Sequence, residues 1–285
     1  MTDQTLYVTD LDGTLMKNDK SISDYTVNTI NRLIDRGLHF TYATARTINS
    51  SSQITSGIKI NIPVITRNGT ILADQKTKEL IEIAKFKRET TEKLRRLLSG
   101  DKIGGFVTSI QDRQEFKTYL AGTEYNAGFQ NYLDEHKDDR RLRAVHNYDE
   151  LFYGDVCYIT IIGDKGELDM VYDKVKLSDG WVCVYQKDNY RPEYWLEICP
   201  EKATKAYAIK KVCELCDCNR VVVFGDSLND ISMFEAADEA YAVENAMREL
   251  KEKATGIIPG NEEDGVARWL EKKYAIHTEN RNSCR

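Results

Sequence analysis

The chain lacks the long apolar runs and the excess of basic charge that mark membrane proteins and nucleic-acid-binding proteins. None of its 285 residues lies in an apolar stretch of about 18 or more, so we expect no membrane span. Its 40 Lys and Arg are outnumbered by 46 Asp and Glu, which argues against a nucleic-acid polymer as a partner. The first residues lack the basic and apolar segments of a signal peptide, and we expect a cytoplasmic protein.

The cysteines show no arrangement that would indicate disulfides or a complete metal site. The seven cysteines are odd in number and scattered, which predicts reduced thiols in a reducing compartment. Cys213, Cys216 and Cys218 include a CxxC spacing that zinc sites use. A structural zinc site needs four ligands, however, and no second pair accompanies them. We therefore interpret this cluster as a helix end with partly buried thiols.

Apolar strand-like runs alternate with helix-like segments through the first 80 and the last 90 residues. Residues 6–11, 38–44, 62–69 and 220–227 are predicted strands, and residues 21–37 and 202–215 are predicted helices. The strand at 220–227 is apolar without alternation, as expected when both faces of a sheet are covered. This pattern predicts an α/β fold with a Rossmann-like, doubly wound parallel sheet.

The middle of the chain differs from the two ends in composition and in the order of its predicted helices and strands. A charged helix at 87–100 is followed by a tyrosine-rich stretch at 116–133, and then by further strand and helix patterns. We expect an inserted α+β domain at 84–191, with 1–83 and 192–285 forming the α/β core. Packing within the insertion is the favoured interpretation of the tyrosines, and lining a substrate pocket is the alternative.

Polar residues collect where the predicted core strands end, and parallel sheets bind ligands beyond those ends. They are Asp10 and Asp12 after the first strand, Thr44 after the second, and Asp226, Asn229 and Asp230 after the late strand. Clustered carboxylates repel one another, and oxygen ligands of this type suit Mg²⁺. Lys205 and the N–H groups at helix starts would complete a phosphate site.

The spacing of the first two acids suggests a division of labour. In an extended strand Asp10 and Asp12 would lie about 6.6 Å apart on the same side. One carboxylate could then attack phosphorus while the other protonates the departing oxygen.

These motifs together resemble the haloacid dehalogenase-like superfamily, and within it the Cof-type (class IIB capped) phosphatases. The matching stretches are DLDGTL at 10–15, the second Thr (Thr44) of TYATAR at 41–46, the second Lys (Lys205) of KATKAYAI at 202–209 and GDSLND at 225–230. Three further stretches are family-like: RNGT at 67–70, Asn245-Ala246 and EDGVARWL at 263–270. The insertion falls where this family carries its α/β cap, which implies that the insertion sets substrate specificity.

The resemblance implies a role for each residue. Asp10 would be the nucleophile that forms an aspartyl-phosphate, and Asp12 the general acid and then the general base. Metal ligands would come from Asp10, the backbone carbonyl of Asp12, and Asp226. Asp230 would either bind the metal directly or support the residues that bind it. The phosphoryl group would be held by Thr44, Lys205 and Asn229, and by the N–H groups of Leu11 and Ala45.

Some assignments stay open at this point. Ala45 stands where relatives often have glycine, although its N–H is retained. Lys202 competes with Lys205, and Arg46 suits either a substrate contact or a structural ion pair. Asn68 would support the Asp10 loop or belong to an ordinary Asn-Gly turn.

The expected function is a Mg²⁺-dependent phosphatase acting on a small phosphorylated metabolite, such as a sugar phosphate, a nucleotide or a cofactor phosphate. The first alternative is a phosphomutase on the same fold. The second is a catalytically silent protein that binds a phosphorylated metabolite.

Overall fold

Two structural units divide the chain. The computed structural model describes residues 4–99, 104–177, 179–188 and 191–282. One unit consists of Met1–Glu82 and Thr204–Arg285, and the other is Ile83–Ala203. The first boundary falls within one residue of the expected one, but the second lies twelve residues later than 191/192. The reason is that β11 (Tyr194–Pro200) pairs with β10 (Trp181–Lys187) and β9 (Asp155–Gly163) in the sheet of the second unit.

The first unit is built on a parallel sheet in the order β14-β13-β12-β1-β2. The strands are β1 (Thr5–Thr9), β2 (His39–Tyr42), β12 (Arg220–Gly225), β13 (Glu239–Val243) and β14 (Gly256–Ile258). From β1 the chain proceeds to β2 in one direction and from β12 to β13 and β14 in the other. The predicted doubly wound sheet is therefore confirmed, with its switch point between β1 and β12.

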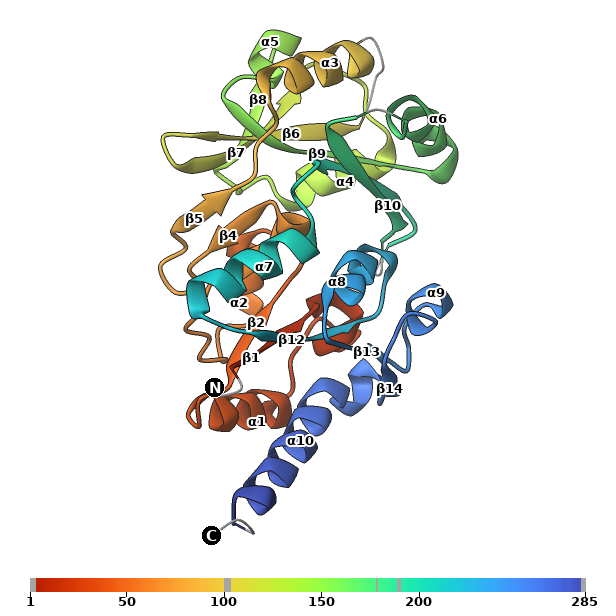
Figure 1. The fold of residues 1–285 in the computed structure, drawn as a ribbon. Coiled ribbons are helices and arrows are strands. Elements are labelled where there is room, and N and C mark those ends of the chain that lie inside the picture. Colours follow the sequence, from red (N-terminus) through yellow and green to blue (C-terminus); the bar gives the residue numbers. More distant parts are fainter. Residues whose placement is uncertain (1–3, 100–103, 178, 189–190, 283–285) are drawn as a thin grey trace. The chain divides into compact units, whose positions relative to one another are not determined.

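Helices cover both faces of this sheet (Figure 1), and α10 packs on α1 while α7 packs on α8. The indole of Trp269 on α10 contacts the rings of Tyr7, Phe224 and Tyr241 on three strands. Coverage on both faces explains why β12 is a continuous apolar run. The helices are α1 (Asp24–Ile34), α2 (Ile48–Ile54), α7 (Lys205–Cys216), α8 (Ile231–Ala236), α9 (Arg248–Lys251) and α10 (Gly265–Asn282).

A small second sheet in this unit follows β2. It contains β3 (Val64–Thr66), β4 (Ile71–Ala73) and β5 (Leu80–Ile83). A parallel bridge between Ala43 and Ile65 links β3 to the chain after β2. A short helical turn, Arg67–Gly69, connects β3 to β4.

The second unit is a six-stranded sheet in the order β10-β11-β9-β6-β7-β8, and only the β7–β8 pair is parallel among its described pairings. Its remaining strands are β6 (Gly105–Gln111), β7 (Gln114–Leu120), β8 (Leu142–Val145), β9 (Asp155–Gly163) and β10 (Trp181–Lys187). Its helices are α3 (Arg88–Leu98), α4 (Ala127–Glu135), α5 (Tyr148–Leu151) and α6 (Lys165–Val175). The expected inserted α+β fold is confirmed.

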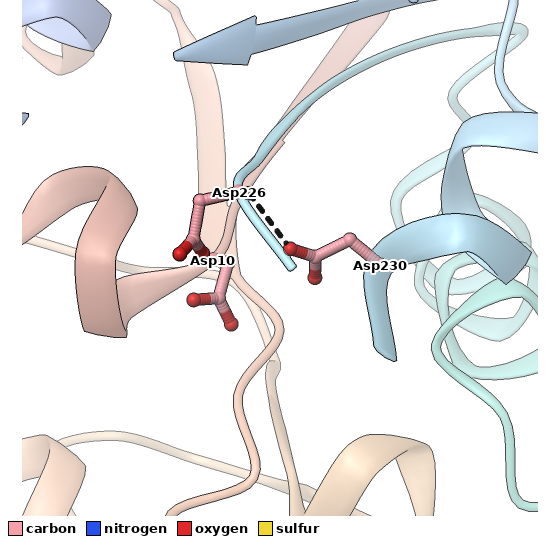
Figure 2. A group of neighbouring side chains, drawn as sticks. All are labelled: Asp10, Asp226 and Asp230. Carbon is pink, nitrogen blue, oxygen red and sulfur yellow. Dashed lines mark hydrogen bonds between the residues drawn. The ribbon is translucent and has the colours of Figure 1, made fainter. Parts of the chain in front are cut away.

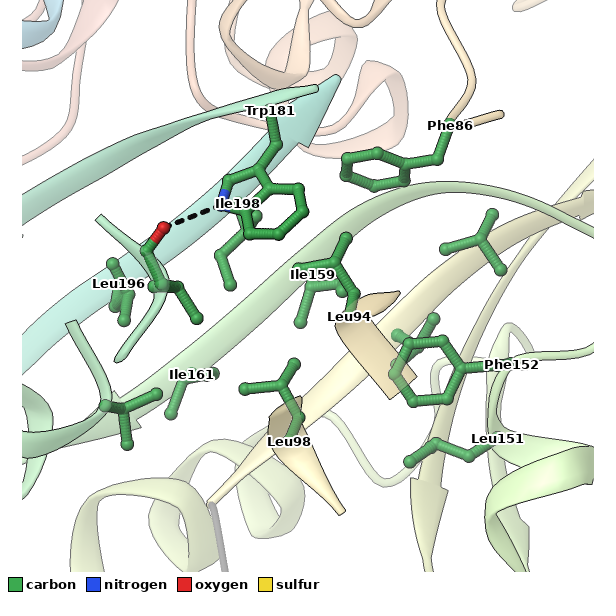
Figure 3. Packing of buried hydrophobic residues seen from close by; sticks show 14 of the residues in the cluster. Phe86, Leu94, Leu98, Leu151, Phe152, Ile159, Ile161, Trp181, Leu196 and Ile198 are labelled. Atoms are coloured by element: carbon green, nitrogen blue, oxygen red, sulfur yellow. Dashed lines mark hydrogen bonds between the residues drawn. The ribbon is translucent and has the colours of Figure 1, made fainter. Parts of the chain in front are cut away.

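This unit has its own hydrophobic core. Figure 3 shows Leu94 and Leu98 of α3 packed among sheet residues and Trp181, whose indole N–H donates to the Val175 carbonyl at 3.0 Å. The tyrosine-rich stretch packs in a second cluster, in which the rings of Tyr125 and Phe129 lie 4.7 Å apart. These tyrosines pack within the insertion, as the favoured interpretation expected, and Tyr125 also lines a cavity of this unit.

The cysteine cluster lies at the C-terminal end of α7, as expected. Cys213, Cys216 and Cys218 are partly buried free thiols, and burial raises the pKa of Cys213 to about 11 and that of Cys218 to about 12. The Cys218 sulfur lies 3.3 Å from Nδ1 of His39. Over the described part of the chain, no helix is long and apolar enough to cross a membrane.

Candidate active site

Three buried carboxylates meet at the carboxyl ends of β1 and β12. Asp10 follows β1, Asp226 follows β12, and Asp230 lies one turn later, with ligand oxygens all within 4.8 Å of one another (Figure 2). Burial, reinforced by Asp230 and Asp12 and opposed by Lys205, raises the pKa of Asp10 to about 7. Burial and the neighbouring carboxylates also raise the pKa of Asp226 well above its usual value. Such a cluster favours the binding of a cation.

Lys205, the first residue of α7, neutralises part of this charge. Its side chain is 1% exposed, and Nζ donates to Oδ1 of Asp10 and to Oδ1 of Asp230, each at 2.6 Å. Burial opposes the charged amine, but the two carboxylates outweigh it and raise the Lys205 pKa. Lys202 is exposed, so the structure selects Lys205 between the two candidates. When all three carboxylates are ionised, they and the one ammonium carry a charge of −2, which a divalent cation would balance.

Asp230 also braces the loop after β12. Its Oδ2 accepts hydrogen bonds from the backbone N–H of Asp226 at 3.0 Å and of Ser227 at 3.1 Å, and Figure 2 marks the first of these. The hydroxyl of Thr14 donates to Oδ1 of Asp226 at 3.0 Å. These bonds fix the orientation of the Asp226 carboxylate, and they place Asp230 where it supports both Lys205 and the loop.

The extended strand expected to run through Asp10 and Asp12 is wrong. β1 ends at Thr9, and the chain turns through Leu11–Leu15 with Gly13 at φ +78°. A Cβ on Gly13 would lie 2.3 Å from Oδ2 of Asp226, so only glycine fits this approach without displacing the carboxylate.

The Asp12 carboxylate pairs with Arg46 instead of joining the three buried acids. Nε of Arg46 lies 2.7 Å from Oδ2 of Asp12, and the guanidinium also donates to Oδ1 at 2.5 Å. Both side chains are about one-fifth exposed. The ion-pair interpretation of Arg46 is confirmed, and the pair fixes the orientation of the Asp12 carboxylate.

The residues expected to hold phosphate lie at the same sheet edge. β1 and β2 run in register with Thr9 opposite Tyr42, so Leu11 and the pair Thr44-Ala45 follow neighbouring strand ends. The Thr44 side chain is buried, and its Oγ1 accepts from the N–H of Arg46 at 3.2 Å.

Asn229 lies on the third segment of the edge. Its side-chain amide donates to Oδ1 of Asn68 at 3.2 Å. All nine predicted site residues therefore belong to one unit, and four of them, Lys205 and the three buried acids, are in direct contact or within 4.8 Å.

A family model described as haloacid dehalogenase-like hydrolase matches residues 7–270. The chain belongs to this hydrolase family. Two curated phosphatases are similar to nearly its whole length. The 5-amino-6-(5-phospho-D-ribitylamino)uracil phosphatase YitU of Bacillus subtilis is 27% identical, with 95% of this chain and 98% of the relative covered. The HMP-PP phosphatase of Yersinia pseudotuberculosis is 27% identical, with 92% of each chain covered.

Solved structures show the same fold. A haloacid dehalogenase-like hydrolase from Bacteroides thetaiotaomicron superposes with a TM-score of 0.74 at 23% identity, covering 94% of this chain and 99% of that one. A HAD/COF-like hydrolase from Plasmodium vivax gives a TM-score of 0.78 at 19% identity, covering 96% of both. The predicted family and the prediction of a phosphatase are confirmed.

Two supporting contacts in this haloacid dehalogenase-like hydrolase were not assigned from the sequence. One is the hydroxyl of Thr14 on Asp226, although Thr14 lies within the DLDGTL motif. The other is Asn245, whose amide donates to the Gly13 carbonyl at 2.7 Å and secures the tight turn. The family-like Asn245-Ala246 pair was the available signal for this contact.

Proposed function

We propose that this haloacid dehalogenase-like phosphatase is Mg²⁺-dependent and transfers the phosphoryl group of a small metabolite to Asp10 before water releases it. The observation that carries the proposal is the buried charge balance around Asp10. One ammonium faces three carboxylates, and the charge of −2 that they carry when all three acids are ionised matches one divalent cation.

The residues present fit such an ion. Carboxylate oxygens of Asp10 and Asp226, with the backbone carbonyl of Asp12, would hold it, and Asp230 would act as a ligand or as the support behind them. All of these are the oxygen ligands that Mg²⁺ prefers. When bound, Mg²⁺ supplies positive charge that stabilises phosphoryl oxygens as they approach the carboxylates.

The chain's own groups would then divide the chemistry. An oxygen of Asp10 forms a bond to phosphorus as the bond to the leaving oxygen breaks, and Asp12 gives that oxygen a proton. Asp12 next takes a proton from water, whose oxygen bonds to phosphorus as the acyl-phosphate bond breaks and Asp10 is regenerated. The guanidinium of Arg46 orients the Asp12 carboxyl group for both transfers, as an ion pair when Asp12 is ionised and through one hydrogen bond to its unprotonated oxygen when Asp12 carries the proton.

The other predicted residues would hold the transferring group. Lys205 neutralises charge on Asp10 and on the phosphoryl oxygens, while the Thr44 hydroxyl and the Asn229 amide donate hydrogen bonds to those oxygens. The N–H groups of Leu11 and Ala45 would complete the set. In phosphoryl transfer such positioning and electrostatic stabilisation account for most of the catalysis.

The substrate is proposed as a small phosphorylated compound. The relatives' names suggest two starting points, 5-amino-6-(5-phospho-D-ribitylamino)uracil and HMP-PP. Sugar phosphates, nucleotides and cofactor phosphates complete the panel. That the inserted unit selects among them stays a prediction.

Hydrolysis of p-nitrophenyl phosphate tests the proposal. The wild-type protein should release nitrophenol with Mg²⁺, lose activity with EDTA, and regain it when Mg²⁺ is restored. Asp10→Asn should abolish turnover, whereas Asp19→Asn, at a fully exposed carboxylate, should leave it unchanged. A wild-type protein that is inactive across the phosphate panel with Mg²⁺ would contradict the proposal and favour the silent binding protein.

The phosphomutase alternative is tested by acceptor competition. In single-turnover reactions, a phosphatase releases inorganic phosphate whether or not a second sugar phosphate is present. A mutase would instead transfer the phosphoryl group to that acceptor. Phosphorylated acceptor as the main product would therefore overturn the hydrolase assignment.

A further inference from the structure

The turn Arg67–Gly69 has a strained backbone beside the proposed site. Its three consecutive residues have positive φ angles of 52°, 53° and 99°. Arginine and asparagine pay a steric cost in this left-handed region, yet Arg67 is 4% exposed and Asn68 is 3% exposed. Buried strain of this kind persists only where surrounding contacts enforce it, and it occurs most often at functional sites.

The first contacts of this turn reach the chain segment after β2. The N–H of Arg67 donates to the Arg46 carbonyl at 3.1 Å, and the N–H of Asn68 donates to the Thr44 carbonyl at 2.9 Å. The turn is therefore bonded to the backbone that carries the Thr44 hydroxyl and the Arg46 guanidinium.

The second contact reaches the start of α7. A Cβ built on Gly69 would lie 2.2 Å from the Thr204 carbonyl oxygen and 2.9 Å from the Lys205 nitrogen. Thr204 caps the helix through its side chain, which accepts from the N–H of Tyr207. The turn thus packs directly on the backbone of the residue whose ammonium pairs with Asp10.

The third contact is made by a side chain. The side-chain oxygen Oδ1 of Asn68 accepts a hydrogen bond from the Asn229 side-chain amide at 3.2 Å. The Asn229 amide keeps a second N–H for a ligand, and the bond to Asn68 sets the direction of that N–H. One buried turn therefore contacts three of the four segments that bring phosphate-binding groups to the sheet edge, those that carry Thr44, Lys205 and Asn229.

We propose that Asn68 is a positioning residue for phosphoryl transfer, acting through the Asn229 amide. The left-handed backbone of the turn, through Asn68 and Gly69, contacts the segments after β2 and before α7, and the Asn68 side chain orients Asn229. This inference rests on the proposed function, because it assigns Asn229 to the phosphoryl oxygens.

Asn68→Gly distinguishes the effect of the Asn68 side chain from the effect of its backbone conformation. Glycine adopts positive φ at little steric cost, so the melting temperature should change little, while the acceptor for Asn229 is lost. With p-nitrophenyl phosphate and Mg²⁺, kcat should fall about tenfold and KM should change by less than about threefold. A purely structural role would leave kcat unchanged when the melting temperature is unchanged.

Two further variants control this measurement. Asn229→Ala should lower kcat by a similar factor. The double variant should be no slower than the slower single variant, because both substitutions remove the same Asn68–Asn229 hydrogen bond. Asn31→Ala is the matched control, because that amide bonds to the Gly57 carbonyl and the Lys59 N–H in the same unit at 2.8 Å each. Its kcat should match the wild type.

A wild-type kcat in Asn68→Gly, or losses that multiply in the double variant, would overturn the inference. If the wild type proves inactive, the proposed function fails separately, and orthovanadate binding in the presence of Mg²⁺ becomes the readout. About tenfold weaker binding by Asn68→Gly would then support the inference, and equal binding would overturn it. Absence of orthovanadate binding by the wild type would overturn both.

Discussion

The ammonium of Lys205 and the guanidinium of Arg46 divide the acids of this site into two groups with different surroundings. Lys205 lies against Asp10 and Asp230 in a buried cluster, whereas Arg46 holds Asp12 in a partly exposed pair. The two carboxylates of the DLDGTL motif therefore experience different electrostatic environments, although one residue separates them. This difference suits one acid for attack on phosphorus and the other for proton transfer.

Lys205→Met should reduce both stability and activity. Without the ammonium, Asp10 and Asp230 remain buried without their cation, so the free energy of unfolding should fall by about 3 kcal/mol in urea titrations without Mg²⁺. Hydrolysis of p-nitrophenyl phosphate should fall at least about 100-fold. Lys202→Met, at an exposed site, should stay within about 0.5 kcal/mol of wild type and remain active. Equal effects of the two substitutions would contradict the assignment.

Arg46→Lys should produce a loss that depends on the leaving group. Lysine keeps the charge but loses the two-pronged pairing with Asp12, so proton donation should suffer. We expect kcat to fall about tenfold for an alkyl phosphate and less than about threefold for p-nitrophenyl phosphate, whose leaving group needs little protonation. Arg32→Lys, in an exposed pair with Glu271, is the control. Equal losses for both substrates would show that Arg46 does not act through Asp12.

At the scale of elements, the site depends on where strands end and how tightly the next residues turn. The run at 220–227 predicted β12 because it is apolar and covered on both faces. β6, β7 and β11 escaped prediction because buried polar residues interrupt their apolar pattern, with Thr108 at 0%, Lys117 at 2% and Glu197 at 4% exposure.

The short strands and the distant pairs also lay beyond the sequence pattern. β4 has three residues and follows the Arg67–Gly69 turn almost directly, so it lacks a longer apolar run such as the one at 62–69 that predicted β3. The residues of the site could be named from motif positions, but the partner of Asp12 could not. Arg46 lies 34 positions away, and the pairing depends on the turn after β1, which replaces the extended strand that was expected.

Gly13→Ala tests the tight turn after β1. Alanine pays about 1 kcal/mol for positive φ, and its Cβ must also displace the Asp226 carboxylate. We expect Mg²⁺ to bind about tenfold more weakly in calorimetric titrations, since one ligand loses its hydrogen-bonded position. Gly37→Ala is a matched control, because Gly37 has φ +96° with nothing within 4 Å of its Cβ position. Gly37→Ala should lower the stability without weakening Mg²⁺ binding. Weaker Mg²⁺ binding by Gly37→Ala would argue against the steric explanation for Gly13→Ala.

At the scale of the whole molecule, ionisation of the buried carboxylates lowers the free energy of unfolding of the metal-free protein. Because the folded-state pKa of Asp10 is raised to about 7, the stability that protonated Asp10 provides is present below pH 4 and is lost as the pH rises through about 7. Asp226 shifts in the same direction. Metal binding should offset this loss, since it needs the ionised carboxylates.

The increase in melting temperature caused by Mg²⁺ should therefore be larger at pH 8 than at pH 5.5, where Mg²⁺ must displace protons. Differential scanning calorimetry with and without Mg²⁺ at each pH measures this effect. Asp226→Asn should remove most of the increase at pH 8. An increase that is independent of pH would show that these buried carboxylates do not bind the ion.

The central claim is that Asp10 carries the phosphoryl group, and trapping the phosphoenzyme tests it most directly. The protein is quenched in acid during turnover of p-nitrophenyl phosphate with Mg²⁺ and reduced with borohydride, which converts an aspartyl-phosphate to homoserine. Peptide mass spectrometry should then find homoserine at position 10 in the wild type and not in Asp10→Asn. Turnover without homoserine at position 10, or with the modification at another residue, would contradict the account.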